Sequence, residues 1–171
     1  MEKTTWIIDP THSEMVFKVK HMMISTVTGN FGEFEGKLET TSENFEDAVF
    51  EASVKTASIS TNNTDRDNHL KSADFFDAET YPEIKFVSTS YESGKLTGDL
   101  TIKNVTKSVV FEVEYNGTAV DPYGQTKSGF EAVAKINRKD FGLTWSAVTE
   151  AGSVVVSDTV SLLVNLQFIK Q

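Results

Sequence analysis

The three histidines, His12, His21 and His69, are the side chains of this sequence best suited to metal binding or to acid-base chemistry near neutral pH. Their spacing matches no established ligand pattern. A metal-assisted enzyme that uses all three around a polar pocket stays open as an alternative. Each also has a plainer interpretation, because His12 follows Asp9 and Pro10 in a turn and His21 fits a hydrogen-bonded core histidine equally well.

Other catalytic signals are missing from the sequence. There is no cysteine, no G-x-S-x-G elbow, no phosphate-binding loop and no dinucleotide fingerprint. The Arg66-Asp67 and Arg138-Asp140 pairs are best interpreted as structural charges that anchor their loops. We therefore predict a protein that is not an enzyme, that holds no metal and that uses no cofactor.

Charge and hydropathy limit the partners. Sixteen basic residues against 25 acidic ones give a formal net charge of -9, and the basic residues form no stripe that would neutralise phosphates, so nucleic acid is not expected. No segment approaches the roughly 18 consecutive apolar residues of a membrane span, so stable membrane insertion is not expected either. The opening MEKTTWIIDP lacks the apolar core of a signal peptide, which predicts a cytoplasmic protein, or a periplasmic one had a leader been removed.

Alternation of apolar and polar residues recurs along nearly the whole chain and predicts β-strands. Met15, Phe17, Val19 and His21 share one face of such a strand. Eight strands are expected, around residues 13–21, 34–38, 48–54, 84–88, 96–102, 109–115, 130–136 and 160–168. A ninth, short strand at residues 6–8 is expected to pair at an edge of the sheet.

Turn compositions separate these strands and predict antiparallel hairpins. They are Gly29-Asn30, Glu92-Ser93-Gly94, Asn116-Gly117 and Asp121-Pro122-Tyr123-Gly124. The capping residues at 61–65 predict a short helix over residues 66–71, and one further turn is expected at residues 137–140.

Residues 1–171 are expected to form a single all-β domain, and the strand pattern alone fits either a closed barrel or a sandwich. Large inward residues alternate with small ones of the same parity, namely Gly36, Ala52, Gly98, Ala132 and Ala134. If these small residues empty the interior, a small barrel holds one ligand. The alternative, equally compatible with the pattern, is that they only complement large neighbours.

Four blocks of the sequence resemble the YceI-like, polyisoprenoid-binding family. They are WIIDPTHSEMVFKVKHMMISTVTGNFGEFEG, RDNHLKSADFFDAETYPEIKFVSTS, LTGDLTIKNVTKSVVFEV and INRKDFGL, and they follow the family's order over nearly the whole chain. The resemblance implies an antiparallel, extended eight-stranded lipocalin-like β-barrel with one or two short helices near its opening. It also implies a cavity for an isoprenoid or another amphiphilic chain.

With this resemblance, the sequence predicts a non-catalytic protein that binds, transports or stores a long-chain amphiphile such as an isoprenoid quinone or a polyprenyl lipid. Entry is expected to need movement of residues 61–76 or of a loop at residues 21–30. Relatives commonly form dimers, and an outward apolar face of Val49, Val110, Val133 and Leu163 keeps a homodimer open. The residues expected to contact the ligand are Phe17, Val19, His21, Phe31, Phe34, Leu38, Phe50, His69, Leu70, Phe75, Phe76, Phe86, Leu100, Phe111 and Phe130.

Overall fold

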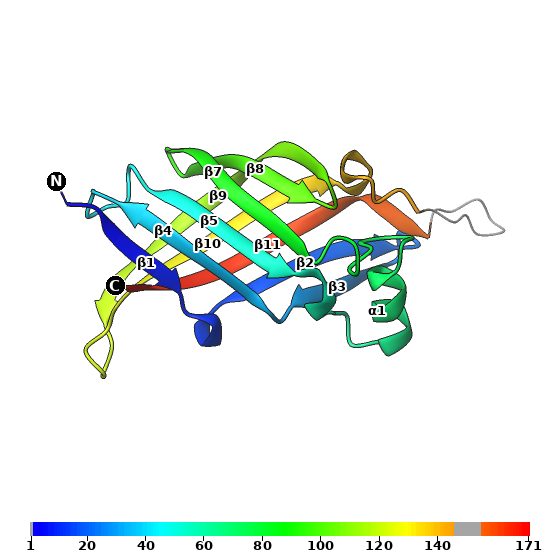
Figure 1. The fold of residues 1–171 in the computed structure, drawn as a ribbon, viewed down its shortest axis with the longest axis horizontal. Helices are drawn as coiled ribbons and strands as arrows, with labels where there is room; N and C mark the ends of the chain where they lie inside the picture. The colour runs from blue at the N-terminus through cyan, green and yellow to red at the C-terminus, as the bar shows by residue number, and fades with distance from the viewer. Residues whose placement is uncertain (1, 146–154) are drawn as a thin grey trace.

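Antiparallel strands wrap into one elongated barrel, and beside it lies the single α-helix of the described residues (Figure 1). The computed structural model describes residues 2–145 and 155–171. The strands are β1 (Thr4–Ile8), β2 (Glu14–His21), β3 (Ser25–Phe31), β4 (Phe34–Thr40), β5 (Val49–Lys55), β6 (Ile59–Ser60), β7 (Glu83–Glu92), β8 (Lys95–Ile102), β9 (Val105–Val120), β10 (Thr126–Asn137) and β11 (Val156–Lys170). The helical elements are α1 (Thr64–Lys71) and the short 3-10 turns η1 (Pro10–His12), η2 (Thr56–Ser58) and η3 (Arg138–Phe141).

Several of these segments are halves of one longer strand. β1 and β2 lie along the same edge of β11, where Ile8 pairs with Phe168 and Glu14 pairs with Asn165, and η1 interrupts them. In the same way β4 pairs with β1 while β3 pairs with β2, and β5 pairs with β4 while β6 pairs with β3. In the described part of the chain, eight long strands therefore close into an antiparallel barrel, as the family resemblance implies.

The first strand closes the barrel, and its expected position at an edge is wrong. Trp6 pairs with Leu38 on β4 and with Lys170 on β11, so β1 has a partner on both sides. The prediction of an edge strand fails because β1 is short and one of its partners, β11, is distant in the sequence. Because β1 pairs on both sides, it is not an open edge of the sheet.

Two of the four expected turns are correct. Ser93 and Gly94 form the tight reversal between β7 and β8, and residues 121–124 join β9 to β10. Gly29 and Asn30 instead lie inside β3, so the expected loop at residues 21–30 reduces to the reversal at residues 22–24. Asn116 and Gly117 lie inside β9, where one extra residue makes a bulge opposite β10.

Both expected helical turns are present. Asn63 caps α1 by accepting a hydrogen bond from the Arg66 amide at 3.0 Å. Asn137 caps η3 by accepting one from the Lys139 amide at 3.0 Å. These side chains end the preceding extended segments because they offer the backbone a local hydrogen-bond partner.

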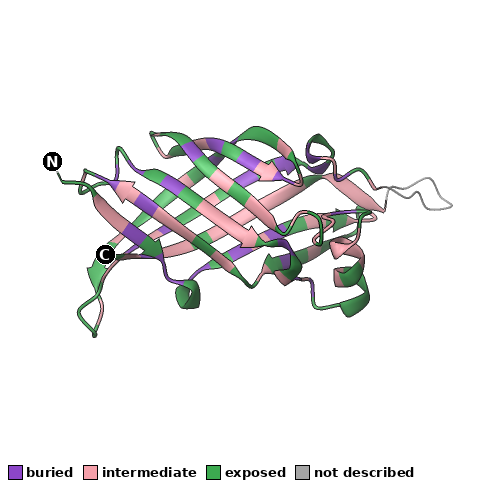
Figure 2. Ribbon diagram, in the orientation of Figure 1, coloured by how far each residue is buried: buried purple, intermediate pink, exposed green. Residues whose placement is uncertain are grey.

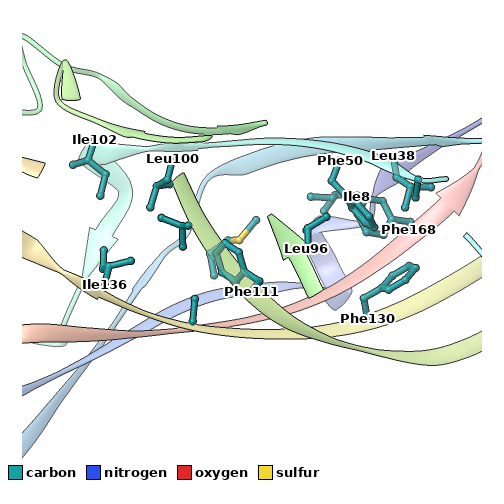
Figure 3. Close-up of a cluster of buried hydrophobic side chains, with 14 of the residues drawn as sticks. Ile8, Leu38, Phe50, Leu96, Leu100, Ile102, Phe111, Phe130, Ile136 and Phe168 are labelled. Atoms are coloured by element: carbon teal, nitrogen blue, oxygen red, sulfur yellow. The ribbon is translucent and has the colours of Figure 1, made fainter. Parts of the chain in front are cut away.

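Buried and exposed residues alternate along the strands, which places one face of each strand inside the barrel (Figure 2). The inward residues form one continuous apolar cluster (Figure 3). At the end that holds both chain termini, Phe45 from the β4–β5 connection packs into the barrel against Trp6, Tyr115 and Phe130 at ring separations of 5.2 to 5.3 Å. We call this aromatic-filled end the closed end.

Candidate ligand-binding cavity

An apolar cavity of about 220 Å³ lies inside the barrel, away from the closed end. Its wall is built by β1, β2, β3, β5, β7, β8, β9, β10 and β11, so nearly every part of the sheet contributes. The polar residues that border it are Glu51, Ser53, Lys85 and Arg138. Glu51, Ser53 and Lys85 alternate with inward residues on β5 and β7, so their side chains point away from the cavity. Among these four, Arg138 is the polar side chain directed toward the cavity.

The floor of the cavity is aromatic. Phe50 and Phe168 border the cavity, with ring centroids 6.0 Å apart, and both rings also pack against Phe130. Phe130 in turn contacts Phe45. The closed end therefore seals the cavity with side chains, and the space begins above Phe50 and Phe168.

The opposite end is covered by residues 61–82, which join β6 to β7 and which we call the strap. Leu70, Phe75 and Phe76 of the strap lie on the cavity wall. The Phe76 ring meets Phe31 of β3 edge to face, with centroids 6.0 Å apart. The strap lies where β6 and β7 do not pair, so its apolar side chains complete the wall at an interruption of the sheet.

Polar contacts within the strap hold α1 to Thr61, the residue that directly follows β6. Asp67 accepts hydrogen bonds from the Thr61 amide at 2.8 Å and from its hydroxyl at 2.6 Å. Arg66 donates to the Thr61 hydroxyl at 2.7 Å and to its carbonyl at 2.6 Å. Arg66 and Asp67 thus both serve to position α1 against β6, and neither lies on the cavity wall.

The small inward residues differ in what they do. A Cβ atom on Gly36 would lie 2.6 Å from the Ile8 side chain, and one on Gly29 would lie 2.3 Å from the Phe17 ring. At these positions a large neighbour fills the space, so the complementing interpretation is correct there. Ala52 and Ala132 border the cavity itself, where their short side chains leave room.

Arg138 is buried, with 3% of its surface exposed, and holds together the segments at the strap end. Its guanidinium donates to the carbonyls of Leu143 at 2.6 Å, Trp145 at 2.7 Å and Ser157 at 2.9 Å. Burial lowers the pKa of this guanidinium below its ordinary value, and Asp158 at 3.8 Å opposes that effect. The sequence predicts that Arg138 anchors the adjoining loop. The structure shows this role, and the partners of the guanidinium are main-chain carbonyls.

Trp145 joins the strap to this anchored segment. Its ring lies 5.0 Å from the His69 ring and 5.3 Å from the Phe75 ring, measured between centroids. His69 also pairs with Asp74 through its Nε2 atom at 2.9 Å. A continuous set of contacts thus runs from Arg138, through Trp145, to the strap.

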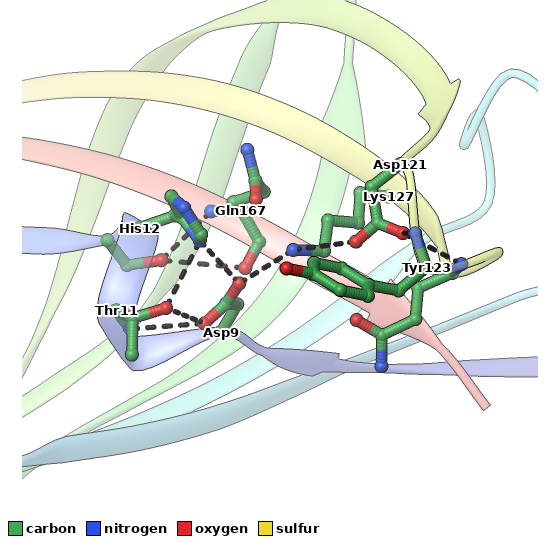
Figure 4. A network of polar contacts seen from close by, with 9 residues as sticks. Asp9, Thr11, His12, Asp121, Tyr123, Lys127 and Gln167 are labelled. Atoms are coloured by element: carbon green, nitrogen blue, oxygen red, sulfur yellow. Dashed lines mark hydrogen bonds and ion pairs between the residues drawn. The ribbon is translucent and has the colours of Figure 1, made fainter.

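A polar network joins η1 to β10 and to the connection between β9 and β10 (Figure 4). The buried Asp9 carboxylate accepts hydrogen bonds from the Thr11 amide at 3.1 Å and pairs with His12 at 2.7 Å and Lys127 at 3.1 Å. Lys127 also pairs with Asp121 at 3.2 Å. Burial alone raises the pKa of Asp9, but the hydrogen bonds from His12, Thr11 and Lys127 outweigh it and hold this pKa well below its usual range.

Comparison with known proteins places this geometry in a family. A model of the YceI-like domain matches residues 6–168. The chain belongs to the YceI-like family. A UPF0312 protein of Staphylococcus aureus strain MSSA476 is 36% identical over 166 residues, covering 96% of this chain and 97% of that protein.

Solved structures share the fold of this YceI-like chain. The Campylobacter jejuni YCEI protein is 34% identical, with a TM-score of 0.76 over 89% of this chain and 90% of that one. A polyisoprenoid binding domain from Saccharophagus degradans is 15% identical, with a TM-score of 0.74 over 97% of this chain and 98% of that one. At that identity the likeness is one of fold.

Most of the residues expected to contact a ligand lie on the cavity wall of the YceI-like barrel. These are Phe17, Val19, Phe31, Phe50, Leu70, Phe75, Phe76, Phe86, Leu100 and Phe111. Five others do not border the cavity. Leu38 and Phe130 pack in the core with Phe45, Phe34 packs beside the core, His21 ends β2, and His69 pairs with Asp74.

The structure does not bring the three histidines together. His12 lies in η1 and pairs with Asp9, whereas His69 lies on the strap. Within residues 2–145 and 155–171, no three His, Cys, Asp or Glu side chains gather as a metal site would require. The helices of this same part of the chain are too short and too polar to span a bilayer.

Some residues of the cavity wall are not among the ligand contacts expected from the sequence. They include Met15, Ile84, Leu96, Ile102, Ile136, Leu143, Val160 and Leu162. The strand members among them share the inward parity, which was a sufficient signal to include them. Leu143 follows η3, outside any strand, and no periodic pattern points to it.

Proposed function

We propose that this YceI-like protein binds a long-chain amphiphile in its barrel, without catalysis, and so transports or stores it. The observation that carries the proposal is the apolar cavity, whose wall combines the strand interiors with three apolar strap residues. The name of the Saccharophagus degradans domain, polyisoprenoid binding, supports an isoprenoid quinone or a polyprenyl lipid as the ligand class.

The size and lining of the cavity favour a slender hydrocarbon chain. Its volume of about 220 Å³ lies below the roughly 300–1,000 Å³ of common ligand pockets. Each buried methylene contributes about 0.8 kcal/mol, so ten of them contribute on the order of 8 kcal/mol before the cost of association. Shape and apolar burial alone therefore supply useful affinity, and a longer chain extends toward the strap.

The polar end of the ligand belongs at the strap end, because the closed end is filled by Phe45 and Phe130. Arg138 spends most of its donors on main-chain carbonyls, so it contributes little direct selection of a headgroup. Contact between the ligand and His21 or His69 stays a prediction, and neither residue borders the cavity. Ligand choice then depends mainly on chain width and length.

Organic extraction of the purified protein followed by mass spectrometry tests the proposal. The matched variants are Ala132→Phe, which places a ring in the cavity, and Val133→Phe, which places one on the outer face of the same strand. We expect the wild-type protein and Val133→Phe to carry the same long-chain molecule, and Ala132→Phe to lose it. An empty wild-type protein that also fails to take up added polyprenol or quinone would refute the proposal, as would equal ligand content in a folded Ala132→Phe.

A further inference from the structure

The reversal between β2 and β3 exposes adjacent apolar side chains at residues 22–24, which we call the β2–β3 tip. The side chains of Met23 and Ile24 are 64% and 81% exposed. Among the exposed large hydrophobic residues of the described chain, these are the two that are neighbours in sequence. Two adjacent apolar side chains at the end of a hairpin form a projecting surface, unlike the single exposed valines of the barrel wall.

The backbone of the tip is strained. Met22 and Met23 have φ angles of 53° and 60°, and the Ile24 amide donates to the His21 carbonyl at 3.2 Å. Two successive left-handed residues in a tight hairpin turn favour Asn and Gly, which adopt this conformation without a steric penalty. Here the chain instead carries two long apolar side chains. A strained conformation that presents exposed apolar groups indicates a requirement other than stability.

The charge around the tip differs from that of the rest of the chain. The segment between Glu14 and Glu33 is the longest stretch of the sequence without Asp or Glu, although the chain as a whole has a net charge of -9. The same segment holds Lys18 and Lys20, both exposed on the outer face of β2. An apolar tip beside lysines matches the interface of an anionic bilayer, where apolar side chains enter the acyl boundary and lysines meet the headgroups.

The tip also lies at the strap end of the barrel, where the polar end of the ligand is proposed to lie. In Figure 1 the β2–β3 reversal and α1 lie at one end of the barrel, opposite both chain termini. The Met22 amide donates to the Val155 carbonyl at 2.8 Å, and His21 pairs with Val156. Val19 and Val156 border the cavity, so the tip continues directly from its wall.

We infer that the β2–β3 tip docks the protein onto anionic lipid bilayers, with Met23 and Ile24 entering the interface and Lys18 and Lys20 meeting the headgroups. This inference rests on the proposed function in that it gives the route by which an amphiphile passes between membrane and cavity. It requires peripheral, reversible contact, since two apolar side chains are too few for stable insertion.

Vesicle flotation with the full chain tests the inference. The vesicles are made of phosphatidylcholine alone or of phosphatidylcholine with phosphatidylglycerol. The double variant Met23→Ser/Ile24→Ser removes the apolar tip, and Val120→Ser/Tyr123→Ser removes two exposed apolar residues at the opposite hairpin, which are 67% and 89% exposed. We expect the tip variant to lose roughly tenfold or more of the binding to anionic vesicles. The control variant is expected to retain binding to anionic vesicles, and added salt is expected to weaken this binding.

Two further variants separate the contributions. Lys18→Gln/Lys20→Gln is expected to reduce the preference for phosphatidylglycerol while leaving weak binding to phosphatidylcholine. Met22→Asn/Met23→Gly is expected to raise resistance to urea, because it relieves the turn, and yet to lose vesicle binding. A loss of binding in this more stable protein excludes misfolding as the cause.

Two outcomes would overturn the inference. One is a wild-type protein that does not float with anionic vesicles, and the other is equal flotation of the wild type and the tip variant. A shift from dimer to monomer in the tip variant, without any vesicle binding by the wild type, would assign the tip to self-association instead. Extraction of the wild-type protein is a separate measurement from flotation, so a wild-type protein that floats with anionic vesicles but carries no lipid would refute the carrier function alone.

Discussion

The ring of Phe86 lies directly over Gly98 on the neighbouring strand. A Cβ atom on residue 98 would come within 2.4 Å of the Phe86 ring and within 2.6 Å of the Val87 carbonyl oxygen. The glycine therefore lets a phenylalanine of the cavity wall lie flat against the sheet. Phe86 also meets Phe111 edge to face at 5.2 Å, so one glycine fixes the position of two wall residues.

Gly98→Ala is expected to destabilise the protein, because the Val87 carbonyl belongs to the backbone and cannot move aside as a flexible side chain does. The expected loss in the free energy of unfolding is about 1–3 kcal/mol, measured by urea denaturation. Gly129→Ala is the matched control, because its Cβ would meet its nearest neighbour at 3.7 Å. Equal stability of the two variants would contradict this packing argument.

This pair also shows what sequence patterns reveal about the interior. The shared parity of Phe17, Phe86 and Gly98 correctly places all three on the inner face, because strand side chains alternate strictly. Parity does not tell whether a glycine leaves a hole or receives a neighbouring ring, because that depends on the register between strands. Gly98 receives a ring, whereas Ala132 borders the cavity.

Connections were harder to predict than strands. Phe45 lies in the connection between β4 and β5, has a left-handed φ of 62° and is only 2% exposed, yet no periodic signal marks it. Its insertion explains why Leu38 and Phe130, both correctly assigned to the inner face, pack in a filled end. The strap residues Leu70, Phe75 and Phe76 were placed on the wall through the family resemblance, since a short helix and a loop carry no parity.

Arg138→Met is expected to cost about 2–4 kcal/mol, because the carbonyls of Leu143, Trp145 and Ser157 lose their donor in a buried region. Lys139→Met is the neighbouring control. Its ammonium pairs with Asp158 at 3.3 Å in an exposed position, so the expected change lies within about 0.5 kcal/mol. Hydrogen exchange should show faster exchange around η3 in the first variant alone. Unchanged exchange there would argue against the anchoring role.

Asp9→Asn is expected to lower the free energy of unfolding at pH 7 by about 1–3 kcal/mol, because the charged acceptor of His12, Thr11 and Lys127 is lost. The folded-state pKa lies below the usual 3.8, so the contribution of this carboxylate is complete above about pH 4. It is lost as the pH falls below that value. The difference between wild type and variant in urea unfolding should therefore shrink between pH 5 and pH 3, both about one unit from the usual pKa. The exposed Asp99→Asn is the control, and a difference independent of pH would contradict the assignment.

Trp145→Ala is expected to accelerate ligand exchange while leaving the amount of bound ligand unchanged. Trp145 contacts His69 and Phe75 on the strap. Trp145 does not itself border the cavity, so the variant loosens the strap and leaves the residues of the cavity wall unchanged. Uptake and release of a fluorescent long-chain probe should both become several-fold faster in stopped-flow measurements, because a common barrier is lowered. Tyr123→Ala, at the opposite end, is the aromatic control. Unchanged kinetics in a folded Trp145→Ala would mean that the ligand does not pass beneath the strap, and would direct attention to the side of the barrel formed by β2 and β3.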